Sequence, residues 1–287
     1  MPSTRLIFGC GYLGSRAAAL WREEGDTVYA VTRSADRVAE FTRQGWRPLV
    51  ADVLDPQSLL NLPAADSLLF AVARGRGSDV PIRRLYVEGL RNVLAALPAE
   101  TARVIYISST GVYAQDDGSW VDEASPTTAQ REGGAASLEA ERVLSADPRG
   151  RTSIIIRMAG LYGPGRVPRR DDLLAGKPLV DPGDGWLNLI HVDDGARIIV
   201  AAADAGLTGV MNVSDGQPVR RREYLQEMAR LLGAPEPTFR PALPDEARSQ
   251  RGSTSKRVGN RRLVEELGME LQIASYRDGL AAILRSE

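Results

Sequence analysis

The stretch Arg5-Leu-Ile-Phe-Gly-Cys-Gly-Tyr-Leu-Gly14 decides the fold, because it joins a short apolar run to three glycines in the spacing G-x-G-x-x-G. Residues 15–24 continue it with a helical pattern, and the apolar run Thr27-Val-Tyr-Ala-Val-Thr32 comes next. This order predicts a strand, a tight turn, a helix and a second strand. A glycine triplet in such a βαβ setting is typical of a dinucleotide-binding turn.

Each glycine of the triplet has a separate expected role. Gly9 allows the tight turn, Gly11 has no Cβ and lets the backbone approach a pyrophosphate, and Gly14 lets the helix pack closely on the strand. Tyr12 and Leu13 lie between them and belong to the same turn. The phosphates are expected at the helix N-terminus, where unpaired N–H groups point at them.

The first half of the chain repeats this alternation of apolar strands and helical segments. The strands are apolar along both faces, which predicts an α/β fold: a Rossmann-type doubly wound parallel sheet with helices on both sides. Ligands of such sheets gather at the carboxyl ends of the strands. The expected strands are 5–8, 27–32, 46–52, 67–72, 103–108 and 152–157, and the expected helices are 15–24, 34–44, 56–60, 82–97 and 135–144.

The second half is less regular and richer in glycine and proline, above all over residues 160–185. It is expected to contain short strands at 187–192 and 210–213, an extended segment at 235–244, and helices at 193–203, 224–232, 261–267 and 276–284. We expect a dinucleotide-binding domain over residues 1–160 that also includes 187–214, and a smaller C-terminal substrate-binding region over 161–186 and 215–287. The tract Arg220-Arg-Arg222 is interpreted as a solvated helix start beside Glu223.

Composition narrows the classes of function. The 287 residues carry 36 basic and 37 acidic side chains, so no global charge draws the protein to nucleic acid or to anionic lipid. The single cysteine and the single histidine exclude an internal disulfide and a Cys/His metal cluster. No apolar run approaches the ~20 residues of a membrane span. We expect a cytoplasmic protein, monomeric or homodimeric, with a small-molecule ligand and no metal, nucleic-acid or membrane partner.

The end of the second expected strand bears on the choice of cofactor. An acidic residue there favours NAD, whereas an arginine favours the 2′-phosphate of NADP. Here Arg33 follows Thr32, and Ser34 and Arg37 lie close by, so we expect NADP rather than NAD. Further cofactor contacts are expected after the third and fourth strands, where Asp52 could accept a hydrogen bond from the adenine amino group; they are Asp52, Val53, Ala71, Val72 and Ala73.

Four motifs in this order resemble the extended short-chain dehydrogenase/reductases, the NAD-dependent epimerase/dehydratase family. They cover almost the whole chain: Gly9–Gly14, Ile107-Ser-Ser-Thr-Gly-Val-Tyr113, Arg157-Met-Ala-Gly-Leu-Tyr-Gly-Pro-Gly-Arg166 and Asn188-Leu-Ile-His-Val-Asp-Asp194. The resemblance implies a catalytic serine at Ser109. It also implies substrate contacts from the third and fourth motifs, at Tyr162, Arg166, Asn188 and His191.

The sequence departs from the family in its proton-transfer pair. The family has a Tyr-x-x-x-Lys helix in which the lysine lowers the tyrosine pKa. The only lysines here are Lys177 and Lys256, and neither lies four residues after a tyrosine. Aligning the segment after the family's lysine places Gly133 and Ser137 at the two positions. The chain is therefore identified as an atypical member.

Substitute acids are available in or beside the loops expected near the nicotinamide. Tyr113 is the first candidate, although such a tyrosine also commonly packs under the substrate; Glu123, Glu132 and His191 are the others. Glu123 and Glu132 also fit solvated loop carboxylates, and His191 fits a half-buried residue beside a helix start. Cys10 is interpreted as a small filler, because no general base is identifiable beside it.

Two functions remain open at this point. The first is an NADP-dependent oxidoreductase, epimerase or dehydratase that acts on a sugar nucleotide or a similar small molecule with a rearranged proton donor. The second is a catalytically silent NADP-sensing or scaffolding protein. The intact binding motifs favour ligand binding, and the missing pair argues against ordinary catalysis.

Overall fold

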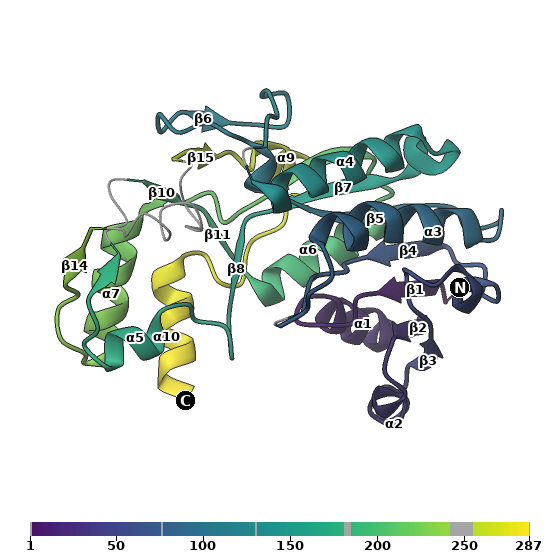
Figure 1. Ribbon diagram of the computed structural model, residues 1–287, viewed down its shortest axis with the longest axis horizontal. Coiled ribbons are helices and arrows are strands. Elements are labelled where there is room, and N and C mark those ends of the chain that lie inside the picture. The colour runs from purple at the N-terminus through teal and green to yellow at the C-terminus, as the bar shows by residue number, and fades with distance from the viewer. Residues whose placement is uncertain (1, 76, 130, 181–184, 242–254, 287) are drawn as a thin grey trace.

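The computed structural model describes residues 2–75, 77–129, 131–180, 185–241 and 255–286. A seven-stranded sheet in the order β12-β7-β5-β4-β1-β2-β3 forms its centre, and every neighbouring pair is parallel. This confirms the predicted doubly wound α/β fold (Figure 1). The strands are β1 (Thr4–Phe8), β2 (Thr27–Thr32), β3 (Arg47–Val50), β4 (Ser67–Phe70), β5 (Val104–Ser109), β7 (Ile154–Met158) and β12 (Gly209–Val213).

The strand order reverses direction between β1 and β4, which lie side by side although β2 and β3 come between them in the chain. At such a switch point the two following loops diverge and leave a crevice beyond the carboxyl ends of the strands. The glycine turn after β1 and the Ala71–Ala73 loop after β4 lie at this point. The topology therefore places the dinucleotide motif at the crevice.

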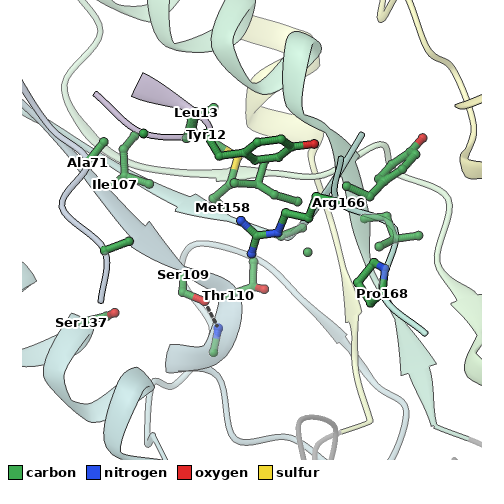
Figure 2. Close-up of a pocket in the computed structure, with 18 of the residues that line it drawn as sticks. Tyr12, Leu13, Ala71, Ile107, Ser109, Thr110, Ser137, Met158, Arg166 and Pro168 are labelled. Atoms are coloured by element: carbon green, nitrogen blue, oxygen red, sulfur yellow. Dashed lines mark hydrogen bonds between the residues drawn. The ribbon is translucent and has the colours of Figure 1, made fainter. Parts of the chain in front are cut away.

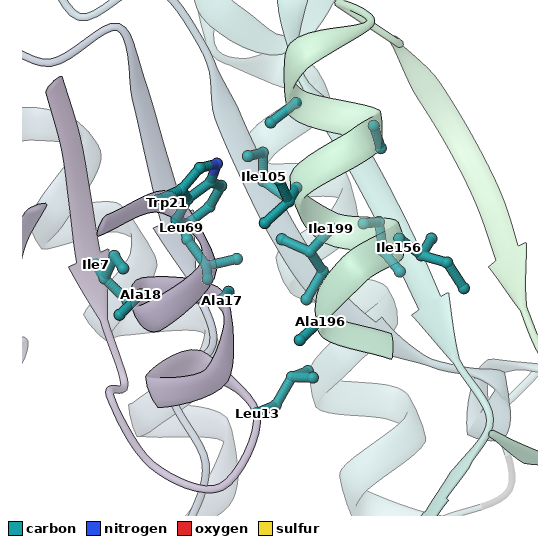
Figure 3. Close-up of a cluster of buried hydrophobic side chains, with 14 of the residues drawn as sticks. Ile7, Leu13, Ala17, Ala18, Trp21, Leu69, Ile105, Ile156, Ala196 and Ile199 are labelled. Carbon is teal, nitrogen blue, oxygen red and sulfur yellow. The ribbon is translucent and has the colours of Figure 1, made fainter. Parts of the chain in front are cut away.

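Helices cover both faces of the sheet. One face packs against α1 (Gly14–Glu23) and α6 (Val192–Asp204), where Ile7, Trp21 and Ile199 belong to one buried cluster (Figure 3). The other face packs against α3 (Gly89–Ala96) and α4 (Glu132–Ala146), and its cluster takes the alternate residues of β1, Leu6 and Phe8. Both faces are dry because strand side chains alternate and both sets are apolar. Two further helices, α2 (Val38–Arg43) and α9 (Arg261–Leu267), contribute Phe41 and Leu263 to the first cluster.

A smaller lobe lies beside the sheet (Figure 1). Its helices are α5 (Arg170–Leu174), α7 (Arg221–Leu232) and α10 (Tyr276–Ser286), which pack around a separate buried cluster that includes Tyr162, Tyr224 and Met228. Three short strand pairs lie outside the seven-stranded sheet: β8 (Gly160–Tyr162) with β11 (Leu189–His191), β9 (Leu179–Val180) with β14 (Phe239–Arg240), and β10 (Trp186–Leu187) with β13 (Val219–Arg220). The fourth such pair is β6 (Trp120–Val121) with β15 (Arg257–Val258). The sequence predicted none of the strands β6, β8, β9, β13 and β15.

Several predicted elements are divided in the structure. The helix expected over 34–44 begins as the 3₁₀ turn η1 (Ala35–Arg37), because the Ser34 hydroxyl oxygen accepts a hydrogen bond from Asp36 N. The helix expected over 82–97 begins with the π-turn η3 (Arg84–Glu88), and the one at 56–60 is the 3₁₀ turn η2 (Pro56–Leu59). The strand expected over 187–192 is two strands, because β10 and β11 pair with different partners.

Of the extended segment expected at 235–244, residues 242–244 lie outside the described residues. Throughout the described ranges, none of the helices combines the length and the hydropathy that a membrane span needs.

Candidate functional site

One cavity of about 1610 Å³ runs along the carboxyl ends of the strands and continues against the smaller lobe. The first residues after β1, β2, β4 and β5 line it, as expected for a parallel sheet. The same cavity reaches α7 and Lys256, the residue before β15, at its other end. A single space therefore connects the glycine turn to the smaller lobe, with room for an extended ligand and a second molecule.

The glycine turn has the geometry that a pyrophosphate needs. A Cβ on Gly9, which has φ +94°, would lie 2.4 Å from the Ala71 carbonyl oxygen, and a Cβ on Gly14 would lie 2.3 Å from the Gly9 carbonyl oxygen. At Gly11 an added Cβ would meet nothing within 4 Å, because the residue faces the cavity. Gly9 and Gly14 thus permit close packing of the chain, whereas Gly11 keeps open the space beside the start of α1.

The predicted cofactor contacts separate into two groups. Arg33, Ser34, Arg37, Val53 and the Ala71–Ala73 loop line the cavity, as do Gly9, Gly11, Tyr12 and Leu13. Gly14 and Asp52 do not line it. The Asp52 carboxylate instead accepts a hydrogen bond of 2.9 Å from Leu54 N within its own turn. The prediction that Asp52 receives the adenine amino group is therefore not supported.

The two arginines at the end of β2 are held differently. Arg37 donates from Nη1 to the Cys10 carbonyl oxygen at 3.0 Å and pairs with Glu40, so its side chain supports the glycine turn. Arg33 is exposed at the edge of the cavity and follows Thr32 directly. A guanidinium there can reach a ligand phosphate without giving up a structural contact.

The far side of the dinucleotide groove carries the hydroxyl groups of Ser109, Thr110 and Ser137 (Figure 2). The Ser109 oxygen accepts a hydrogen bond of 3.0 Å from Gly111 N, which starts the 3₁₀ turn η4 (Thr110–Val112). This fixes Ser109 at the carboxyl end of β5, where the Ser109 hydroxyl can still donate its proton to a ligand. Ser137 is buried on α4, on the helix face that meets this turn, and Gly133 lies one turn earlier.

The structure contradicts the expectation that Tyr113 serves as a substitute acid. Its side chain is fully buried and does not line the cavity. The phenolic O–H donates to Asn212 Oδ1 at 2.8 Å and the oxygen accepts from Arg157 Nη1 at 2.9 Å. Burial raises the pKa of the Tyr113 phenol, which is opposite to what a proton donor near neutral pH requires.

The other proposed acids also have structural roles. His191 is 5% exposed and accepts a hydrogen bond from Asp193 N at the start of α6; burial lowers its pKa. It does not line the cavity, so the expectation that it binds substrate is wrong. Glu123 accepts a hydrogen bond of 2.7 Å from Asn212 N, and Glu132 is exposed at the first turn of α4. Burial raises the pKa of the Cys10 thiol to about 12, as expected for an inert filler.

The remaining predicted substrate contacts do line the cavity. Tyr162 does so from β8 with its phenol near the Ser275 carbonyl oxygen, and Arg166 extends beside the Tyr12 ring (Figure 2). Asn188 lies between β10 and β11 and binds a segment that is distant in the sequence. Its Nδ2 donates to the Lys256 carbonyl oxygen at 2.9 Å, and its Oδ1 accepts from Val258 N at 2.7 Å. Asn188 therefore fixes the segment that contains Lys256.

Sequence reasoning missed six cavity-lining cations: Arg131, Arg169, Lys177, Arg221, Arg240 and Lys256. Arg221 corrects the interpretation of the tract 220–222: α7 does begin there, but Arg221 is partly buried against the cavity. The sequence gives Lys256 no role, since no tyrosine lies four residues before it. Its position beside the cavity depends on the pairing of β6 with β15, for which two-residue strands give no sequence signal. No group of metal-ligating residues is present within the described ranges.

Comparison with known proteins gives a consistent family match. The family model described as the NAD dependent epimerase/dehydratase family matches residues 6–214. A 3-diazoavenalumate denitrifying reductase from a Streptomyces species is 32% identical, and the match covers 94% of this chain and 96% of that protein. Protein YeeZ from Escherichia coli K12 is 31% identical over 93% of this chain and 94% of its own length.

A solved structure shares the fold at lower identity. It is the DesIV double mutant, a dTDP-glucose 4,6-dehydratase from Streptomyces venezuelae that was solved with NAD and DAU bound. It superposes with a TM-score of 0.82 at 23% identity, and the match covers 98% of this chain and 95% of that one.

Proposed function

The chain belongs to the NAD-dependent epimerase/dehydratase family, and on that premise we propose that it is an NADP(H)-dependent oxidoreductase that reduces a small molecule. The observation that carries this proposal is the single cavity that connects the open Gly11 turn to Ser109 and then to the smaller lobe. When bound, NADPH supplies the hydride. The name of the Streptomyces relative, a reductase, supports the direction of reduction.

The preference for NADP over NAD rests on the end of β2. Thr32 and Arg33 occupy the place where an acidic residue would grip the ribose of NAD. Arg33 offers a planar, permanently charged donor to a 2′-phosphate, and an arginine–phosphate contact is charge-assisted. Ser34 adds a hydroxyl at the edge of the same cavity.

In this proposal a group other than a Tyr-x-x-x-Lys pair donates the proton for the reaction. Gly133 has no side chain and Ser137 has a hydroxyl with no lysine beside it on α4. Neither can act as a phenolic acid near neutral pH. We therefore expect slow turnover of alcohols and nucleotide sugars, because the family's usual reaction on them depends on a phenolic proton donor. The favoured substrates accept a hydride and take their proton from water or from another group of the cavity wall.

A second candidate is a silent NADP-sensing or scaffolding protein. Gly133 and Ser137 on α4 favour it, because they replace the family's tyrosine and lysine. The burial of Tyr113 also favours it, because it removes the first substitute acid. Cofactor binding does not separate the two candidates. Consumption of bound NADPH does, because only the oxidoreductase oxidises it.

The test has two stages. Titration by NADPH and NADH fluorescence first measures the two affinities, and we expect NADPH to bind more tightly. Loss of NADPH absorbance is then followed with nucleotide sugars, aldehydes and oxo acids. Multiple-turnover oxidation of NADPH with any of these supports the oxidoreductase. Tight NADPH binding with no oxidation by any of them would favour the sensing protein.

A further inference from the structure

The half of the cavity that lies against the smaller lobe has a positively charged wall. Its cations come from loops, from α7 and from the short strand β14: Arg131, Arg166, Arg169, Lys177, Arg221, Arg240 and Lys256. Asp172 is the single carboxylate among the described residues that line the cavity, and it is paired with Arg169 at 3.2 Å and Lys177 at 3.9 Å. Among the described residues, the wall therefore has an excess of positive charge, although the whole chain is nearly neutral.

Three of these cations, Lys256, Arg221 and Arg131, line the same cavity near enough for their charges to act on one another. Lys256 is 6% exposed, and Arg131 and Arg221 are each partly buried. Burial lowers the pKa of Lys256 to about 8, and the charges of Arg221 and Arg131 contribute to the lowering. Burial and the charge of Arg131 also lower the pKa of Arg221. The free energy of such like charges falls when an anion binds among them.

Lys256 is held firmly on the cavity wall. Its Nζ donates to the Tyr113 carbonyl oxygen at 2.9 Å, and its own carbonyl oxygen accepts from Asn188 Nδ2. The neighbouring Arg257 N donates to the Ser119 carbonyl oxygen at 2.8 Å as part of the β6–β15 pair. A cation that is fixed by the backbone in this way loses little further freedom when it binds a ligand.

We propose that Lys256, Arg221 and Arg131 form a subsite that binds the anionic group, a carboxylate or a phosphate ester, of the substrate. The proposal rests on the proposed function and adds the chemical class of its substrate, an organic anion. Arg221 and Arg131 supply planar guanidinium donors suited to two oxygens of one anion, and Lys256 supplies a point charge.

The position of the subsite also bears on the orientation of the substrate. Tyr113, to whose carbonyl oxygen Lys256 is bound, follows Ser109 after the single turn η4. Arg131 directly precedes α4, the helix that carries Ser137. The cations thus belong to the same wall as the hydroxyls at the end of the dinucleotide groove. An anion bound there leaves the uncharged part of the substrate to face Ser109.

Calorimetric titration of the full chain, with and without saturating NADP⁺, tests the subsite through binding alone. The probes are benzoate with benzamide as its uncharged counterpart, and uridine monophosphate with uridine. We expect at least one anion to bind more tightly than its neutral counterpart. Benzoate binding alone identifies a carboxylate ligand, and uridine monophosphate binding alone identifies a phosphate ester.

Variants connect the binding to the three residues. Arg221→Gln and Lys256→Met should lower the affinity for the anion about tenfold to a hundredfold, as expected for loss of a charge-assisted hydrogen bond. Lys256→Arg should retain most of the affinity. The matched control is Arg220→Gln, because Arg220 is the adjacent residue but lies over the Trp186 ring and does not line this cavity. Circular dichroism on each sample shows whether the variant is folded.

The results separate the two proposals. Equal binding of anions and neutral counterparts, or equal losses in Arg221→Gln and Arg220→Gln, would overturn the subsite while leaving NADPH binding intact. A chain that does not bind NADPH at all would overturn the proposed function whatever the anions do. If Lys256→Met fails to fold, Arg221→Gln decides the result by itself.

Discussion

Nη1 of Arg157 donates a hydrogen bond of 2.9 Å to the phenolic oxygen of Tyr113 in a buried network under the cavity. The same guanidinium forms an ion pair of 2.8 Å with Glu141 on α4, and the Tyr113 hydroxyl donates to Asn212 on β12. Tyr113 therefore joins β7, α4 and β12 and has no access to a ligand. A motif position that suggests catalysis is used here for the packing of the sheet.

Tyr113→Phe should destabilise the protein without changing cofactor binding. The substitution leaves Arg157 Nη1 and Asn212 Oδ1 without their buried partner, which costs about 1–3 kcal/mol of unfolding free energy. Chemical denaturation measures the loss, and NADPH titration should give an unchanged affinity. Tyr29→Phe is the control, because the Tyr29 hydroxyl bonds to the exposed Arg47 and its removal should cost less. Loss of NADPH oxidation in a folded Tyr113→Phe protein would restore Tyr113 as a catalytic candidate.

Arg33→Gln should remove the preference for NADPH. The charge-assisted contact with the 2′-phosphate is worth about tenfold to a hundredfold in affinity, whereas NADH lacks that phosphate and should bind as before. Fluorescence titration with both cofactors measures the two affinities. Arg47→Gln removes a similarly exposed arginine that does not line the cavity and should change neither. The interpretation of Arg33 fails if the unmodified protein binds both cofactors equally.

Gly11→Val should abolish dinucleotide binding in a folded protein. No protein atom lies within 4 Å of an added Cβ at Gly11, so the valine meets only the ligand. Gly9→Val is the contrasting variant, because its Cβ would overlap the Ala71 carbonyl at 2.4 Å and should impair folding as well. Circular dichroism and cofactor titration on the same samples distinguish the two effects. Normal NADPH binding by Gly11→Val would contradict the assignment of the glycine turn.

Asp215→Asn should remove a pH dependence of stability. Burial raises the pKa of Asp215 to about 7, and the side chain is 8% exposed. The folded state therefore holds a proton that the unfolded state loses near pH 4, and stability falls as pH rises from about 4 to about 7, by up to about 1.4 kcal/mol per unit. Asparagine stays neutral and can still accept the hydrogen bond from Gln217 N. Thermal melting across this pH range should show a flatter profile for the variant; parallel profiles would exclude Asp215 as the cause.

Gly133→Tyr with Ser137→Lys should increase turnover of substrates that need a phenolic proton donor. Such a donor is worth roughly 10²–10⁴-fold in rate. A Cβ on Gly133 would lie 3.6 Å from Ile82 Cδ1, an ordinary contact, and Ser137 already lines the cavity. The rate of NADPH oxidation with aldehydes is the measurement, and Ser137→Lys alone is the control. An unmodified protein that already turns over nucleotide sugars at typical enzyme rates would show that another group donates the proton.

The sequence by itself determined the parts of the fold that depend on local pattern. Apolar strands alternating with helices predicted the parallel sheet, and the glycine spacing predicted the turn after β1, because backbone conformation and side-chain periodicity are encoded within a few residues. The same local signals gave the cavity-lining positions of Arg33, Ser109 and the Ala71–Ala73 loop.

Only the tertiary structure decided which side chains face the ligand. Tyr113 and His191 stand in motifs that suggest the site, yet the packing of β7, β12 and α6 buries them. Lys256 lies 143 positions from the Tyr113 carbonyl that it contacts, and the pairing of two-residue strands brings it there. The direction of a side chain depends on the registers of distant elements, and no local pattern in the sequence records them.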